Sequence, residues 1–85
     1  MIIEEDLAKN LSLLFDLPLD NEITHSKSKS LKIRVLNYEG IAVSECKQMK
    51  EVLYVDDHDN LYRVKSRLCH GKDNNYWLYF MYIRV

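Results

Sequence analysis

The sequence predicts an α+β fold in which an N-terminal amphipathic helix packs on a four- to five-stranded antiparallel β-meander sheet. Two patterns lead to this expectation. Apolar residues near the N-terminus recur at helical spacing, whereas from Leu31 onward apolar and polar residues alternate, as they do in a half-buried strand. With 85 residues and 47% apolar or aromatic side chains, the chain has enough core material for a single small domain over residues 1–85.

The N-terminal segment has the spacing of one helix face. The apolar residues of this stripe follow each other at intervals of four and three residues and are Ile3, Leu7, Leu11 and Leu14. Pro18 stops the helix, because the residue before a proline avoids the α region. We therefore expect a helix over residues 3–16, and a polar loop over residues 20–30 that joins it to the sheet.

Residues 31–85 predict antiparallel strands joined by short turns, because parallel neighbours need long crossovers. The expected strands lie at 31–35, 41–43, 52–55, 61–68 and 76–85, and the stretch 45–50 reads as a loop or a short helical turn. The last strand is apolar on both faces, which indicates that both are covered. Since one helix covers only one face, the other is closed by the long loop, curled into a half-barrel or docked on a partner.

Three groups of residues invite a metal or catalytic interpretation, and none has the spacing that it needs. The run 56–59 lacks the glycine and the distal glutamate of a calcium loop, so a plain turn is expected. His58, Cys46, Cys69 and His70 include no C-x-x-C or H-x-x-x-H pair for zinc. Neighbouring residues on a strand point to opposite faces, so Cys69 and His70 would not form a nucleophile–base pair. The sequence predicts no enzyme activity, no cofactor and no metal site.

The cysteines and the apolar segments indicate a compartment. Cys46 and Cys69 are too few for the disulfide framework of a small secreted protein, and a cysteine in a small core usually acts as a buried apolar side chain. The first residues run directly into Glu4 and show no secretory leader. The longest apolar run, 76–83, is far shorter than a bilayer-spanning helix. These observations predict a cytoplasmic protein with no membrane partner.

The formal net charge of −1 hides an uneven distribution. Residues 1–23 carry six acidic residues and one lysine, a net charge of −5, and the remainder of the chain carries +4. Such a division directs partners of opposite sign to different faces. The acidic N-terminal segment has the charge to mimic nucleic acid toward a basic partner, although a solvated helix end is the simpler interpretation.

Basic and aromatic residues are interleaved in the expected sheet. Lys32 and Arg34 share one face of a strand, and Arg63, Lys65 and Arg67 share one face of another. If these faces coincide, five cations lie beside tyrosines, which suits a protein interface or single-stranded nucleic acid. A solvated sheet face is the plainest interpretation, and a pI near 6.3 argues against an ordinary nucleic-acid binder. The residues predicted to contact a partner are Arg63, Lys65, Arg67, Tyr76, Tyr79 and Tyr82.

These features favour a small non-enzymatic protein that binds a larger host enzyme and inhibits or modulates it. Glycine, proline and alanine are scarce, a profile that also occurs in short phage or mobile-element reading frames. Anti-CRISPR and other anti-defence proteins share the small size and the lack of a catalytic motif. Two alternatives stay open: a single-stranded RNA- or DNA-binding module, and a protein that self-associates as a homodimer through its open sheet face.

Overall fold

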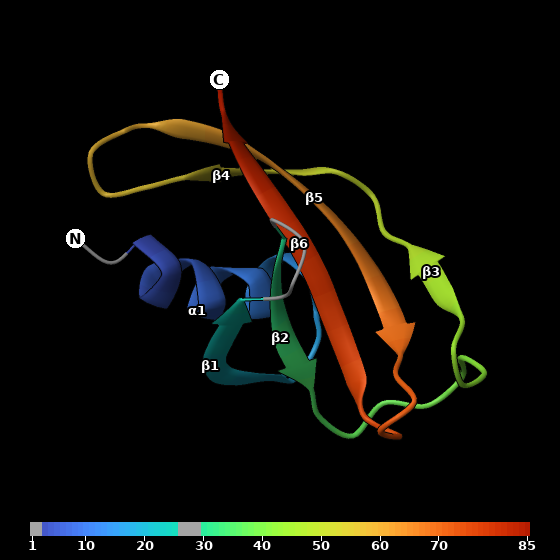
Figure 1. Ribbon diagram of the computed structural model, residues 1–85. Coiled ribbons are helices and arrows are strands. Elements are labelled where there is room, and N and C mark those ends of the chain that lie inside the picture. Colours follow the sequence, from blue (N-terminus) through green and yellow to red (C-terminus); the bar gives the residue numbers. More distant parts are fainter. Residues whose placement is uncertain (1–2, 26–29) are drawn as a thin grey trace.

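The computed structural model describes residues 3–25 and 30–85, without the side chains of residues 3–6, 8, 21 and 25. The described backbone forms one helix, α1 (Ile3–Phe15), and six strands (Figure 1). The strands are β1 (Leu19–His25), β2 (Leu31–Val35), β3 (Cys46–Gln48), β4 (Val52–Val55), β5 (Leu61–His70) and β6 (Tyr76–Arg84). The acidic side chains of residues 4–6 lie outside the described residues. The structure therefore does not test whether they mimic the charge of nucleic acid.

All six strands belong to one antiparallel sheet with the order β1-β2-β6-β5-β3. β6 lies at its centre and pairs with β5 on one side and with β2 on the other. β5 is long enough to pair with two short strands along its other edge, β4 near its start and β3 near its end. Figure 1 shows β5 and β6 as one long, twisted pair that crosses the molecule.

The predicted fold class, α+β with a helix on a four- to five-stranded meander, is wrong, because the chain is mostly β. A meander would pair β2 with the next strand of the chain, but β1 and β6 occupy both edges of β2. The strand expected at 41–43 is consequently a loop, and the chain crosses to the far edge of β5 before β3 begins. A central β6, rather than sequential hairpins, organises the sheet.

Much of the segment predicted as a polar loop over 20–30 is also strand. Its first part belongs to β1, and residues 26–29 lie outside the described residues. Leu19 and Ile23 pack against the core from β1, while most other positions of this strand are polar. Two apolar residues four positions apart do not produce a clear alternation, which explains why the pattern conceals this edge strand. α1 packs mainly against β1.

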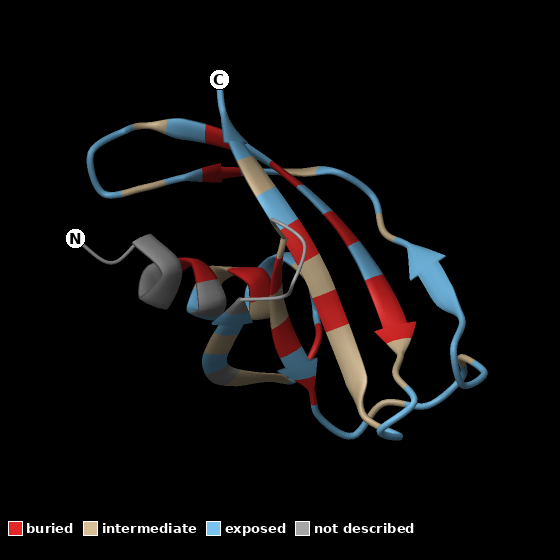
Figure 2. Ribbon diagram, viewed as in Figure 1, coloured by how far each residue is buried: buried red, intermediate tan, exposed pale blue. Residues whose placement is uncertain are grey.

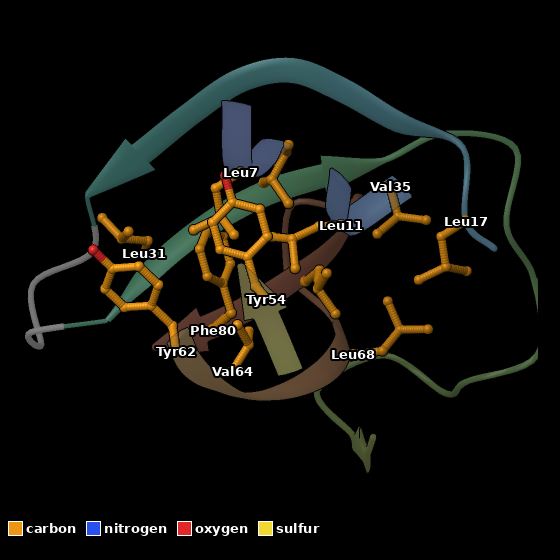
Figure 3. Packing of buried hydrophobic residues seen from close by; sticks show 12 residues of the cluster. Leu7, Leu11, Leu17, Leu31, Val35, Tyr54, Tyr62, Val64, Leu68 and Phe80 are labelled. Atoms are coloured by element: carbon orange, nitrogen blue, oxygen red, sulfur yellow. The ribbon is translucent and has the colours of Figure 1, made fainter. Parts of the chain in front are cut away.

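The core lies between α1 and one face of the sheet, called here the inner face. Buried inner-face residues alternate along the strands (Figure 2) and are Leu31, Ile33, Val35, Tyr54, Tyr62, Val64, Ser66, Leu68, Leu78 and Phe80. Leu7 and Leu11 of α1 are fully buried against them, and Figure 3 shows both beside Tyr54 and Phe80. Leu14 of the predicted stripe is 39% exposed, whereas Leu17 beyond the helix is buried.

Ser66 is a polar residue within this apolar core. It stands opposite Phe80, and its buried Oγ has no hydrogen-bond partner among the described residues. A buried hydroxyl without a partner costs about 1–3 kcal/mol. We therefore expect Ser66→Ala to raise the free energy of unfolding by about 1 kcal/mol, measured by urea denaturation. Ser66→Thr keeps the hydroxyl and should bring no gain, and a less stable alanine variant would show that the hydroxyl is satisfied.

Candidate functional site

The strand register assembles aromatic, apolar and basic side chains on the outer face of the sheet, the face that points away from α1. β6 supplies a central row of Trp77, Tyr79, Met81 and Ile83. Five cations flank this row, Lys32 and Arg34 from β2 and Arg63, Lys65 and Arg67 from β5. β2 and β5 do not pair with each other, so β6 is what brings the two sets of cations onto one face. The two groups of cations therefore share one face with Tyr79, which is the condition that the predicted basic and aromatic surface required.

Two of the five cations lie over aromatic rings of the central row. Lys32 Nζ is 4.2 Å from the centroid of the Trp77 ring, and Arg67 Cζ is 5.7 Å from that of Tyr79. Cations within about 6 Å of a ring centroid are attracted to the negative face of the ring. Each ring thus turns a face, and not only its edge, toward a cationic group.

Carboxylates approach the outer face at the Trp77 end. Asp20 accepts a hydrogen bond from Arg34 Nη2 at 3.2 Å, and Asp73 accepts one from Trp77 Nε1 at 3.1 Å. A hydrogen bond from the backbone N–H of Asn75 is the main cause that lowers the pKa of Asp73, so this carboxylate stays ionised. The three cations of β5, by contrast, form no ion pair with any described residue. The uncompensated positive charge of this face therefore lies along β5.

A hollow of about 260 Å³ is lined by residues of β5, β6 and β3 and by Ser30, which precedes β2. Lys65 and Arg67 line it from β5, Tyr79 and Met81 from β6, and Gln48 from β3. Gln48 Nε2 donates a hydrogen bond to the Ser66 carbonyl at 3.3 Å, which fixes the amide at the rim. Two cations, a phenol ring and an apolar side chain therefore meet at one recess.

The other end of the outer face, beside the β4–β5 hairpin, is apolar. Six exposed side chains form this apolar end: Leu53, Val55, Leu61, Met81, Ile83 and Val85. The register places Arg63 between Leu53 and Ile83. Val55 stands opposite Leu61, whose carbonyl accepts a hydrogen bond from the Val85 N–H at 2.9 Å. The exposed fractions run from 36% for Leu61 to 72% for Val85, so no described residue covers this end.

The six predicted partner-contacting residues divide between the two faces. The outer face holds Arg63, Lys65, Arg67 and Tyr79. Tyr82 and Tyr76 alternate onto the inner face, where Tyr82 meets Tyr62 edge-on with centroids 5.6 Å apart and Tyr76 stacks on His70 at 4.1 Å. The prediction omitted Lys32, Arg34, Trp77, Met81 and Ile83. The period of two along β6 was the signal that could have separated the tyrosines.

The residues considered for zinc are spread among other roles. Cys46 and Cys69 face each other across β3 and β5 and form a disulfide, contrary to the expectation of two unpaired thiols. The ring nitrogens of His70 contact the Ile41 carbonyl at 2.7 Å and Asn74 Oδ1 at 2.9 Å. Within the described part of the chain, no three His, Cys, Asp or Glu residues gather in a way that could hold a metal ion.

The acidic run 56–59 forms a turn, as predicted. Asp56 Oδ1 accepts hydrogen bonds from the N–H groups of His58 and Asn60, both at 2.9 Å, and Oδ2 accepts one from the Tyr62 hydroxyl at 3.1 Å. Burial raises the pKa of Asp56, but these hydrogen bonds and one from the Asn60 side chain outweigh it and lower the pKa to about 2. The Asp56 carboxylate is therefore engaged in closing the turn.

Comparison of the chain with protein-family models, with curated proteins and with solved structures finds no match. Among the described residues, no helix combines the length and the apolar character needed to cross a bilayer. The outer face is thus the feature from which function is argued.

Proposed function

We propose that this chain is a non-enzymatic binding protein that docks on a larger protein through the apolar end of its outer face. The observation that carries the proposal is the gathering of six exposed apolar side chains around the β4–β5 hairpin. Contiguous apolar surface is uncommon on proteins that work alone, because its contact with water is unfavourable. Docking removes that surface from water and supplies the driving force.

Arg63 indicates what the partner presents. Its position between Leu53 and Ile83 surrounds a guanidinium with apolar side chains. Once a partner excludes water, such a cation needs a carboxylate that takes its hydrogen bonds. Arginine is also frequent among the residues that dominate binding energy. The complementary surface is therefore apolar around an Asp or Glu.

The partner that we propose is a host enzyme, and the source of the chain a phage or mobile element, with a role like that of anti-CRISPR and other anti-defence proteins. Small size and composition support these parts of the proposal. The cytoplasm is the compartment expected from the sequence, but the disulfide between Cys46 and Cys69 weighs against it, because cytosolic thiols are usually kept reduced. A reduced pair in the producing cell would support the cytoplasm, and an oxidised pair would support an oxidising compartment.

The docking proposal is tested with a double variant, Leu53→Thr with Ile83→Thr, which removes apolar contact while keeping strand-forming residues. Val43→Thr is the matched control, because Val43 is 52% exposed but lies in the loop between β2 and β3. We expect a host protein to bind the original chain and the control equally, and the double variant at least about tenfold more weakly. Affinity capture from host lysate followed by titration of the captured protein measures this.

Equal capture by the double variant and the control would overturn the proposal. Sizing of the isolated chain completes the test. Elution well above 10.1 kDa that the double variant abolishes would show that the apolar end binds a second copy instead of a foreign protein.

A further inference from the structure

We propose that the opposite end of the outer face binds single-stranded nucleic acid. This cationic end consists of Lys32, Arg34, Lys65, Arg67, Trp77 and Tyr79. The inference goes beyond the docking function, because it uses a different part of the face and a partner of different chemistry. Three observations carry it: the distribution of charge, the presentation of the two rings and the hollow beside Tyr79.

The cations lie on both sides of the central row. Lys32 on β2 and Arg67 on β5 both stand opposite Tyr79, with β6 between them. Two strand spacings separate them, or roughly 10 Å. A polyanion that runs along β6 therefore meets Lys65 and Arg67 on the β5 side and Lys32 on the β2 side, where Arg34 is paired with Asp20. Because Lys65 and Arg67 form no ion pair with described residues, their charge is available to it.

The rings of Trp77 and Tyr79 form a platform with a regular spacing. They lie two residues apart on one face of β6, which separates them by roughly 6.7 Å. The cation over each ring occupies the position that a stacked base would take. Attraction between a cation and a ring is weak at exposed sites, so a phosphate can draw the cation away and leave the ring to a base. Successive bases of a single strand stack on such rings, whereas the bases of a duplex already stack on each other.

The hollow of about 260 Å³ lies directly beside this platform. Its lining combines Tyr79 with Lys65 and Arg67, so a recess for a flat group and two phosphate partners occur at the same point. A purely acidic peptide would satisfy the charges and leave both rings without a flat partner. The chemistry of this end therefore favours nucleic acid over acidic protein.

The pI of about 6.3 does not contradict this assignment, because the charges are segregated. Net negative charge belongs to residues 1–23, whose helix packs its Leu7 and Leu11 on the inner face. Binding depends on the local field of the surface that is contacted, and the cationic end carries four cations.

Trp77 is the only tryptophan of the chain and reports directly on stacking. We expect an oligo-dT of about 12 nucleotides to quench Trp77 fluorescence and to raise the anisotropy of a fluorescent end label at about 50 mM salt. Inorganic polyphosphate and polyglutamate, used as charge-only probes, should bind more weakly and leave Trp77 emission unchanged. A duplex of equal length should also bind more weakly than the single strand.

Three variants separate stacking from charge. Tyr79→Val removes a ring but keeps a strand-forming residue and should weaken oligo-dT binding about tenfold or more. Arg67→Gln should weaken it several-fold and reduce the slope of log affinity against log salt by about 0.7. Lys9→Gln is the matched control, because Lys9 is exposed on α1, and it should bind like the original chain. Retained strand signal in circular dichroism confirms that each variant folds.

The proposal is overturned by any of four results. These are no oligo-dT binding at low salt, equal binding of polyphosphate without quenching, equal affinity for the duplex, and unchanged affinity in folded Tyr79→Val. The double variant at Leu53 and Ile83 should bind oligo-dT normally. A negative result for the docking proposal therefore leaves the nucleic-acid proposal standing, and the reverse also holds.

Discussion

Phe80→Ala should reduce the free energy of unfolding by about 3–5 kcal/mol, the usual cost of emptying a buried aromatic site. Phe80 is 1% exposed and lies on the inner face of β6, opposite Ser66 of β5 and Leu31 of β2. A chain of 85 residues typically has only about 4–12 kcal/mol of stability in total. The variant should consequently be close to unfolded at 37 °C, which thermal and urea denaturation will measure.

Met81→Ala is the natural control, because Met81 is the next residue and points to the opposite face. It is 44% exposed, so its truncation should cost less than about 1 kcal/mol. The contrast between two adjacent positions tests the orientation of β6 itself. Similar costs at both positions would mean that the inner and outer faces are wrongly assigned.

Removal of the disulfide should be the second large effect, at about 3 kcal/mol. Cys46 and Cys69 are 23 positions apart, and release of a loop of this length restores considerable entropy to the unfolded chain. The cleanest comparison is the double variant Cys46→Ala with Cys69→Ala, because Cys69 is buried and a serine would place a hydroxyl there. Urea denaturation with and without dithiothreitol measures the change.

The loss should be largest at β3. This strand has three residues, all of them exposed, so little apolar burial holds it on β5. Apart from the disulfide, it is flanked by backbone hydrogen bonds such as Ser44 N–H to the His70 carbonyl at 2.7 Å. Amide exchange of residues 44–49 should therefore accelerate most on reduction. Dithiothreitol should not affect the double alanine variant, and an equal effect there would contradict this explanation.

Local patterns predicted the faces of the long strands, because these depend on periodicity alone. They also predicted the burial of Leu7 and Leu11 on the helix, but Leu14 of the same stripe is exposed. Alternation along β5 and β6 separates outer Arg67 and Tyr79 from inner Leu68 and Phe80. Strand order does not depend on periodicity. Nothing in the residues 31–35 indicates that their partner is β6, whose paired residues lie 41 to 49 positions further along the chain, rather than the next segment. The same limit concealed the disulfide, since the separation of two cysteines in sequence says nothing about their approach in space.

The candidate site could likewise be predicted only as far as the alternation within each strand. The alternation placed Lys32 with Arg34, and Arg63 with Lys65 and Arg67, but only long-range pairing decided that the two groups share a face. Tyr76 and Tyr82 were grouped with Tyr79 because tyrosine is frequent at interfaces, although their even spacing from Phe80 assigns them to the core side. Composition was given more weight there than geometry.

The central place of β6 also governs how the chain acquires its structure. β1 with β2, and β3 and β4 with β5, are two groups that touch through pairing only when β6 lies between them. The pairing of β2 with β6 closes a long loop of chain. The conformational entropy of this loop is lost before new contacts compensate for it. Sheets dominated by such distant partners usually form in milliseconds to seconds, far more slowly than helical bundles of similar size. Until β6 inserts, β2 and β5 each expose an unpaired edge, and this interval is when the chain is most prone to aggregate.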